Sequence, residues 1–252
     1  MLKKRMIGVI TVKNGRAVQS FGYDSYLPLG KPWCLAENLD RWGVDEILIL
    51  SVDRSINNSG PDYSLLKSIL KAKLSVPVIY GGGIVSKDQA IKVIQNGADR
   101  IVLDSVIHDN PSAVYEIAAS IGSQAIIASL PVTLISSKLY WYNYRTKKNN
   151  LFSNNLNKLI SDMVISELLI VDIVGNGRLN GFNVNILKYL DFPANLVLFG
   201  GINSDEQISK LLSDSRVSAI SLGNSLNYNE HAVQKIKRKY ENYLRLAIFN
   251  EC

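Results

Sequence analysis

The chain of 252 residues carries a formal net charge of +6 and is 47% hydrophobic, so its length suits one α/β barrel or two small domains. Its two cysteines, Cys34 and Cys252, form neither a disulfide framework nor a metal-ligand spacing, which favours a reducing cytoplasm. The apolar run after the basic N-terminus spans only about six residues, which excludes a signal peptide, and no later run is long enough to cross a membrane. We therefore expect a cytoplasmic protein without membrane association.

Short β-branched runs recur along the chain, and each is followed by a segment with helical periodicity. The predicted strands are Arg5–Val12, Glu46–Val52, Val76–Tyr80, Arg100–Leu103, Gln124–Ser129, Glu167–Ile173, Leu196–Phe199 and Ala219–Leu222. The predicted helices are Pro61–Lys73, Lys87–Asn96, Ser112–Ile121, Asn154–Met163, Asp205–Leu212 and Glu230–Arg245. Because continuous apolar strands are typical of sheets covered on both faces, this alternation predicts a (β/α)8 TIM barrel, a single domain over residues 1–252.

Two segments depart from the simple alternation. Lys138–Asn150 alternates aromatic and polar residues and then turns at Lys147–Asn150, which predicts a hairpin inserted after the fifth strand. Lys235–Arg245 is basic with apolar residues at helical spacing, which indicates a terminal helix with a solvated face. A contact with an acidic partner protein stays open. We expect no nucleic-acid site, because no recognised module accompanies this charge.

Two stretches of the sequence nearly repeat each other. Val78–Ile94 and Val197–Leu212 share a Gly-Gly-Ile-x-Ser motif, 118 residues apart. The strand before the first motif resembles the strand before the second, and the strands after the two motifs also resemble each other. The spacing is close to half the chain, so we predict two duplicated half-barrels, about residues 1–121 and 122–252.

Each glycine motif follows a strand and precedes a helix, where backbone amides can converge on an anion. The next strand in each half ends in small polar residues, and this pairing is the usual phosphate site of a barrel. The residues concerned are Gly82, Gly83, Asp104 and Ser105 in the first half, and Gly200, Gly201, Asn224 and Ser225 in the second. Two such sites would hold a small molecule with a phosphate at each end. The alternative is that the glycines only make tight turns.

Several stretches together carry a family resemblance, among them KKRMIGVITVKNGR, GVDEILIL, VPVIYGGGIVSKDQAIKVIQNGADRIVLDS, NPSAVYEIAASIGSQAI and GGINSDEQISKLL. With the duplication and the hairpin, they resemble HisF, the cyclase subunit of imidazole glycerol phosphate synthase, along almost the whole chain. The resemblance implies a barrel that binds a bisphosphorylated substrate at its C-terminal mouth. It also implies a HisH-like glutaminase partner at the N-terminal face and ammonia passing through the barrel.

The partner-facing end keeps the family pattern. The resemblance places an ammonia gate at Arg5, Glu46, Arg100 and Glu167, with Arg100 where lysine is usual. Charges inside a closed strand end are costly unless they are paired, so the alternative is a purely structural set of ion pairs. Asp99 and Gln124 match positions of the glutaminase interface.

The mouth departs from the family pattern. The two catalytic aspartate positions hold Thr11 and Pro131, which supply neither a general acid nor a general base near neutral pH. Ser51 and Asn176 also stand where the family has aspartate, and Asp104 stands where asparagine would help to bind phosphate. Asp53 and Asp172 are candidate substitutes for the lost acid and base. The residues still suited to phosphate are Gly82, Gly83, Ser105, Gly177, Gly200, Gly201, Asn224 and Ser225.

This combination resembles the HisF paralogues of bacterial surface-polysaccharide gene clusters. That resemblance implies a subunit that passes ammonia from a HisH-like glutaminase to a sugar amidotransferase, without ordinary cyclase activity. Two alternatives stay open: a genuine cyclase subunit of histidine biosynthesis with rearranged catalytic groups, and a barrel acting on another phosphorylated sugar. We expect no metal and no organic cofactor, because His108 and His231 have no partners at ligand spacing.

Overall fold

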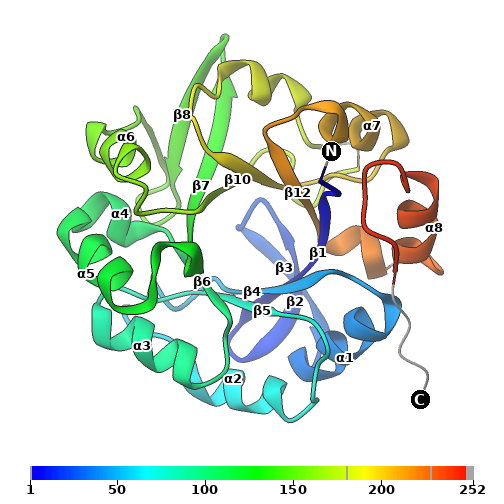
Figure 1. The fold of residues 1–252 in the computed structure, drawn as a ribbon, viewed down its shortest axis with the longest axis horizontal. Helices are drawn as coiled ribbons and strands as arrows, with labels where there is room; N and C mark the ends of the chain where they lie inside the picture. Colours follow the sequence, from blue (N-terminus) through cyan, green and yellow to red (C-terminus); the bar gives the residue numbers. More distant parts are fainter. Residues whose placement is uncertain (1, 180, 228, 248–252) are drawn as a thin grey trace.

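Eight parallel strands close into a barrel in the computed structural model, which describes residues 2–179, 181–227 and 229–247 (Figure 1). The strands lie in the order β10-β11-β12-β1-β4-β5-β6-β7, and β7 pairs with β10 to close the ring. Their bounds are β1 (Arg5–Lys13), β4 (Glu46–Ser51), β5 (Val78–Gly81), β6 (Arg100–Leu103), β7 (Ile126–Ile135), β10 (Glu167–Asp172), β11 (Asn195–Phe199) and β12 (Val217–Leu222). The predicted TIM barrel is confirmed.

Helices surround the barrel on its outside (Figure 1). They are α1 (Pro32–Trp42), α2 (Tyr63–Leu70), α3 (Lys87–Gln95), α4 (Ser105–Asp109), α5 (Pro111–Ile121), α6 (Asn154–Ser161), α7 (Asp205–Ser213) and α8 (Ala232–Lys239). Short 3₁₀ turns are η1 (Ser123–Ala125), η2 (Val184–Tyr189) and η3 (Asn224–Asn227). The sequence did not predict α1, and η2 stands where a regular barrel would place an α-helix after β10.

The repeated glycine motifs end in matching helix caps. Ser86 accepts a hydrogen bond from the Gln89 amide at the start of α3, and Ser204 accepts one from the Gln207 amide at the start of α7. A serine hydroxyl at this position satisfies an amide that has no partner within the helix. The shared serine and glutamine of the two motifs are therefore explained by capping, independently of any ligand.

Two apolar layers account for the continuous apolar character of the barrel strands. Alternate side chains face the axis and pack into an inner cluster: Ile7, Val9, Leu48, Ile79, Val102, Ile127, Leu169, Val171, Ile173, Val197, Phe199 and Ala219. The side chains between them face outward into a larger cluster that the helices cover. Each strand is thus buried on both faces.

The strand registers repeat between the two halves. Glu46 lies opposite Ile7 and Leu50 opposite Thr11 in the β1–β4 pair. In the β7–β10 pair, Glu167 lies opposite Ile127 and Val171 opposite Pro131. Thr11 and Pro131 therefore occupy equivalent places. The division into two half-barrels stays a prediction, and this repeated register supports it.

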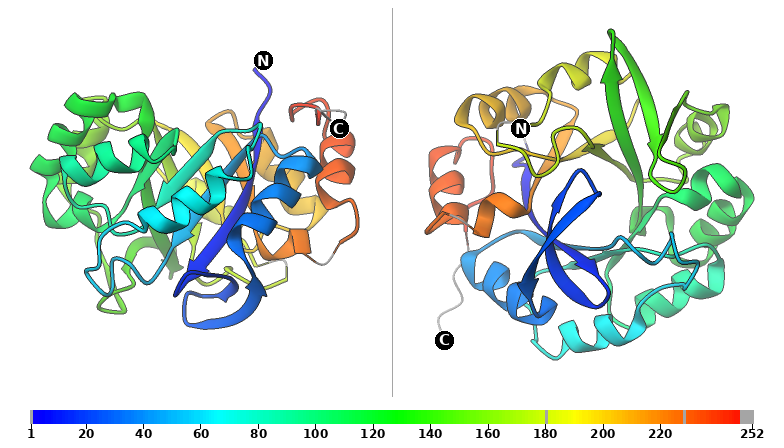
Figure 2. Two further views of the ribbon diagram at one scale, coloured as in Figure 1. Left: turned by 90° about the horizontal axis from the view of Figure 1, so that it is seen from below. Right: turned by 180° about the vertical axis from the view of Figure 1, so that it is seen from behind.

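Two hairpins extend beyond the strand ends at one side of the barrel (Figure 2). The predicted one is β8 (Lys138–Asn143) with β9 (Lys148–Asn150), and β8 pairs with the long end of β7. Its turn covers residues 144–147, so the prediction of a turn at Lys147–Asn150 was wrong. The other hairpin, β2 (Arg16–Phe21) with β3 (Ser25–Gly30), was not predicted and lies across the barrel opening.

The terminal helix α8 is shorter than predicted, and one of its lysines points inward. Lys237 Nζ lies 2.8 Å from Asp45 Oδ1, and the two side chains are only 2% and 9% exposed. Asp45 also accepts a hydrogen bond of 2.7 Å from the Met6 amide, which ties α8 to the start of β1. Among the described residues, no helix is long and apolar enough to cross a membrane.

We predict that Lys237→Met lowers the free energy of unfolding by about 3 kcal/mol, because it leaves the Asp45 carboxylate buried without its cation. Lys239→Met is the matched control, since Lys239 pairs with Asp205 at the surface and such pairs contribute about 0–1 kcal/mol. Urea unfolding of both variants measures the difference. Equal, small losses in the two variants would show that the buried pair does not anchor α8.

Candidate functional site

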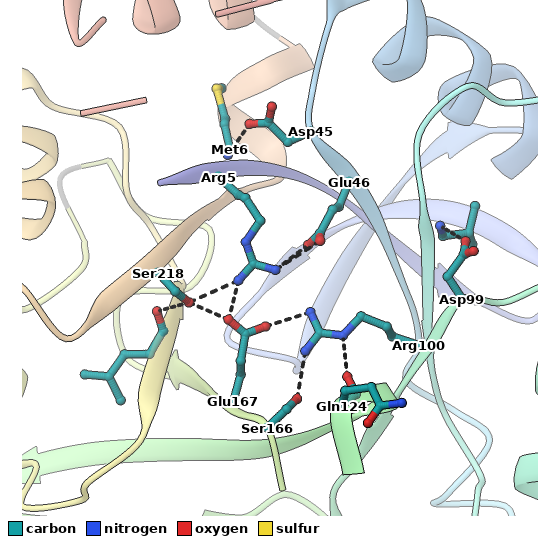
Figure 3. A network of polar contacts seen from close by, with 12 residues as sticks. Arg5, Met6, Asp45, Glu46, Asp99, Arg100, Gln124, Ser166, Glu167 and Ser218 are labelled. Atoms are coloured by element: carbon teal, nitrogen blue, oxygen red, sulfur yellow. Dashed lines mark hydrogen bonds and ion pairs between the residues drawn. The ribbon is translucent and has the colours of Figure 1, made fainter. Parts of the chain in front are cut away.

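Four charged residues meet at the N-terminal end of the barrel (Figure 3). Arg5, Glu46, Arg100 and Glu167 are the first residues of β1, β4, β6 and β10, respectively. Their side chains face the axis, because each stands in register with the inward-facing residues of its strand. The structure thus brings together all the residues that the resemblance assigns to a gate, and we call them the charge cluster.

Glu167 is the centre of the charge cluster. It forms ion pairs with both Arg5 and Arg100, the second at 2.6 Å, and accepts a hydrogen bond of 2.6 Å from Ser218. Arg5 also pairs with Glu46 at 3.0 Å. Within the described residues no ion pair joins Arg100 to Glu46, so the cluster is a chain of three ion pairs with one open side.

Mutual pairing keeps the charge cluster ionised despite burial. The four side chains are only 8–15% exposed. Burial lowers the pKa of Arg5, but Glu167 and Glu46 outweigh this and raise its pKa overall. Burial likewise raises the pKa of Glu167, but Arg5, Arg100 and Ser218 lower it overall. The charges of the two arginines and the two glutamates therefore balance one another.

The two predicted interface residues lie beside the charge cluster, and both are exposed. The Asp99 carboxylate accepts a hydrogen bond of 2.7 Å from the Val78 amide. The Gln124 carbonyl accepts one of 3.2 Å from Arg100 Nε. The Gln124 side chain makes none of the hydrogen bonds found at this end, so its amide is available to a partner protein.

The opposite end of the barrel contains a cavity of about 380 Å³, which we call the mouth cavity. Its floor consists of inward-facing strand residues, among them Leu50, Val102 and Val171. Its walls come from the first glycine loop and from the two hairpins. The lining residues are Lys13, Asn14, Tyr23, Asp24, Tyr26, Leu50, Ser51, Val52, Asp53, Ser55, Ile56, Asn57, Gly81, Gly82, Gly83, Ile84, Val102, Asp104, Ser105, Ser129, Pro131, Tyr144, Lys147, Val171 and Ile173.

Asp104 is the deepest acidic group of the mouth cavity. It follows β6 on the same inward-facing row as Arg100 and Val102. Its Oδ1 atom is inaccessible to solvent and has no hydrogen-bond partner among the described residues. Burial raises the pKa of Asp104 to about 7, although a hydrogen bond from Ser129 and the charge of Arg145 lower it.

Tyrosines surround this carboxyl. Tyr23 comes from the turn between β2 and β3, and Tyr144 comes from the turn between β8 and β9. Burial first, and then nearby groups that include Asp104, raise the pKa of both hydroxyls, so both tyrosines stay neutral near pH 7. Sequence reasoning missed these two residues, since both lie in turns. The Asn14-Gly15 pair, with φ of 50° and 71°, was an available indication of the turn from β1 into β2, the strand that precedes Tyr23.

The family's acid and base positions carry no titratable group in the mouth. Pro131 lines the mouth cavity, whereas Thr11 is buried and does not line it. Ser51 lines the cavity, and buried Asn176 lies in the loop after β10.

The two candidate substitutes differ in position. Asp53 lines the mouth cavity near its rim and accepts a hydrogen bond of 3.0 Å from the Asn14 amide. Asp172 is 2% exposed, and its carboxylate accepts hydrogen bonds from the Gly175 and Asn183 amides at 3.0 and 2.8 Å. It lines a separate hollow of about 480 Å³ between β7 and residues 181–186. Of the two, only Asp53 shares the cavity with Asp104.

The second glycine loop packs against the loop after β10. A side chain on Gly201 would collide with Gly175 and Arg178 of that loop, and one on Gly177, in the same loop, would collide with Ser20 and Phe21 of β2. The Asn224 amide donates a hydrogen bond of 2.9 Å to the Ser20 carbonyl. Gly200 and Ser225 do not line the mouth cavity.

The first glycine loop is open to the mouth cavity, but one of its amides is occupied. Gly82, Gly83 and Ser105 all line the cavity. The Gly83 amide donates a hydrogen bond of 3.1 Å to the Ser55 hydroxyl. Phosphate binding at either loop stays a prediction. The first loop lines the mouth cavity and the second does not, although Gly83 is buried and its counterpart Gly201 is partly exposed.

The described residues include no group of three or more histidines, cysteines, aspartates or glutamates that could hold a metal ion. His108 stacks on Trp141 with ring centroids 3.6 Å apart, and burial lowers its pKa to about 4. Its ring therefore packs the hairpin against α4 as a neutral group.

Comparisons with known proteins give a consistent relationship. A model of the histidine biosynthesis protein family matches residues 5–232. The imidazole glycerol phosphate synthase subunit HisF of an Exiguobacterium species is 27% identical over 94% of this chain and 93% of its own. A protein of Vibrio vulnificus provisionally named imidazole glycerol phosphate synthase subunit hisF2 is 26% identical over 96% and 90%. These similarities confirm the resemblance that the sequence motifs predicted.

We predict that the free energy of unfolding of the wild type decreases with rising pH because of Asp104, and that Asp104→Asn abolishes this decrease. The folded-state pKa of about 7 lies above the unfolded value, so the folded chain binds more protons than the unfolded chain between about pH 4 and pH 7. The wild-type free energy of unfolding should therefore fall, relative to the variant, as the pH rises through this window. Urea unfolding at a series of pH values measures the difference, and parallel profiles would contradict the burial of this carboxyl.

Proposed function

Because the chain belongs to the histidine biosynthesis protein family, we propose that it is the barrel subunit of a glutamine-dependent complex. It pairs with a HisH-like glutaminase and conducts ammonia along its axis to the mouth cavity. The ammonia serves a separate sugar amidotransferase of surface-polysaccharide synthesis, and the chain itself lacks ordinary cyclase activity. The observation that carries this proposal is the contrast between the two ends of the barrel.

The N-terminal end of the barrel combines a possible entrance for ammonia with exposed residues that a glutaminase could contact. The charge cluster closes the axis with ion pairs, and its open side between Arg100 and Glu46 is the place where a small neutral molecule would pass. Asp99 and Gln124 lie exposed beside it. A docked glutaminase would cover this end and deliver ammonia to the cluster without release into water.

The interior suits neutral ammonia better than ammonium. The inner cluster between the two ends is aliphatic except for Phe199. Transfer of an ion into such surroundings is strongly unfavourable unless it is paired, whereas a small neutral molecule has no charge to desolvate. The charge cluster would therefore admit ammonia in its uncharged form.

The C-terminal end lacks what imidazole ring formation needs. The two catalytic aspartate positions of the resemblance hold Thr11 and Pro131, and the second glycine loop does not line the mouth cavity. A bisphosphorylated substrate in this cavity would lack the paired acid and base and would reach only the first glycine loop. In this proposal a phosphorylated ligand retains one anchoring place, at Gly82, Gly83 and Ser105.

A genuine cyclase subunit of histidine biosynthesis is the second candidate. The names of the similar proteins favour it, and Asp104 is an acidic group with a pKa near neutrality inside the mouth cavity. Complementation of a histidine auxotroph lacking its own HisF separates the two candidates. Growth without histidine supports the second candidate and contradicts the first.

The partnership is tested by co-expression with a HisH-type glutaminase of the same organism. We expect the two chains to co-purify and the rate of glutamine hydrolysis to rise when they combine. A glutaminase that neither binds nor changes its rate would remove the basis of the proposal.

We predict that Asp99→Lys weakens glutaminase binding by about tenfold or more, because it replaces an exposed anion by a cation at the interface. Glu206→Lys is the matched control, since Glu206 is 79% exposed and stands at the start of α7, at the mouth end of the barrel. The dissociation constants of both variants are measured by calorimetry. Equal affinities would place the partner elsewhere on the surface.

A further inference from the structure

Two residues that line the mouth cavity, Asp104 and Ser51, have a buried polar atom without a hydrogen-bond partner among the described residues, and of the two Asp104 is the one that can carry a charge. Asp104 Oδ1 is inaccessible to solvent and accepts no hydrogen bond from the described residues, although it lies beside a cavity of about 380 Å³. A buried carboxylate oxygen in this state is unfavourable by several kcal/mol unless a ligand or a proton satisfies it. The position of the atom therefore indicates what a ligand has to supply, namely a donor or a positive charge.

The cations near Asp104 are engaged elsewhere. Arg145 pairs with Asp109 at 2.7 Å. Lys147 pairs with Asp24 at 3.0 Å. Lys13 lies over the Tyr26 ring, 3.9 Å from its centroid. Among the described residues, none of these cations forms an ion pair with Asp104. The negative charge of this carboxylate can therefore be balanced by a bound molecule.

The walls around Asp104 suit a small cation. Tyr23 and Tyr144 stand on two different hairpins and line the cavity together with Tyr26. Aromatic faces attract ammonium groups, and this attraction is strongest where water is excluded. An anion at the same depth would meet an unpaired carboxylate and aromatic faces, both of which repel it.

We propose that the mouth cavity binds a small cation of the ammonium type, ammonium itself or a protonated primary amine, with Asp104 as its counter-ion and tyrosine rings as its walls. This inference rests on the geometry of the cavity and not on the proposed function, and it stands whether or not a glutaminase docks at the other end. If ammonia does arrive through the barrel as NH3, a protonated Asp104 transfers its proton to the nitrogen. The result is NH4+ paired with the carboxylate, and no other reactant is needed.

Binding should depend on pH through Asp104. The groups that face it are Ser129 on β7, Tyr23 and Tyr144 on the hairpin turns, Arg145 on the second turn and Asp109 at the end of α4. Both tyrosines stay neutral and the arginine stays charged near pH 7. Cation affinity should therefore rise as Asp104 ionises, through about pH 7, while methylammonium stays protonated up to about pH 10, as a lysine side chain does.

The experiment titrates methylammonium chloride into the full-length chain at about pH 8, following the tyrosine ring resonances by NMR, with potassium chloride at equal ionic strength as the salt control. We expect saturable binding to the wild type. Asp104→Asn should weaken it by at least about tenfold, the loss of one charge-assisted hydrogen bond. Glu206→Gln is the matched control, because Glu206 is 79% exposed on α7 and does not line the cavity, and we expect its affinity to stay within about twofold of the wild type.

Three results would overturn the proposal. They are the absence of methylammonium binding to the wild type, an equal loss in both variants, and an affinity that does not change between about pH 6 and pH 8. Sodium sulfate is titrated in parallel. If sulfate shifts the tyrosine resonances and methylammonium does not, the cavity is an anion site. Thermal unfolding of both variants confirms that they are folded, and Asp104→Asn, which removes a buried charge, should melt no lower than the wild type.

Discussion

The pairing of two arginines with two glutamates inside a closed ring of strands is the constraint on which the rest of the structure depends. Each of the four is the first residue of a barrel strand, so its side chain points at the axis, where water is scarce. An unpaired charge there would be strongly unfavourable, and removal of Arg5 or of Glu167 leaves Glu46 or Arg100, respectively, without its partner. The cluster also fixes which side chains of β1, β4, β6 and β10 face inward. The inward-facing residues of β6 and its continuation are Arg100, Val102 and Asp104. One strand therefore contributes both a member of the charge cluster and the buried acid of the mouth cavity.

The two halves of the barrel follow one plan but differ in how their loops are used. In the first half, the glycine loop opens into the mouth cavity. In the second half, the loop after β10 packs onto the equivalent glycine Gly201, β2 packs onto Gly177 of that loop, and Asn224 bonds to the Ser20 carbonyl. Close packing of backbone against backbone explains why glycine is retained there without any ligand. The duplicated motif is thus evidence for the shared architecture, and the use of each copy has to be argued from its own contacts.

The barrel was predictable from the sequence because strand periodicity is a local pattern, whereas the charge cluster was predicted only through the family resemblance. The hairpin formed by β2 and β3 was missed, although Asn14-Gly15 marks the turn between β1 and β2. The roles of Tyr23 and Tyr144 could not be predicted, because two separate hairpins bring them together only in the folded chain. Asp104 was predicted among the phosphate-binding residues, at a position where asparagine would suit an anion better. Its lack of an ion-pair partner among the described residues depends on Arg145 pairing with Asp109 instead, which no sequence pattern indicates.

The proposed function depends on a contrast with the family pattern. The N-terminal end keeps the charge cluster and the interface residues, whereas the mouth lacks the two catalytic aspartates. The most direct measurement supplies the purified chain with free ammonium and the bisphosphorylated substrate of HisF, and follows the formation of imidazole glycerol phosphate. Free ammonium bypasses any glutaminase, so the assay isolates the chemistry of the mouth. The account predicts no ring closure above the uncatalysed rate. Efficient turnover would contradict it and would show that the mouth performs the family reaction with other residues.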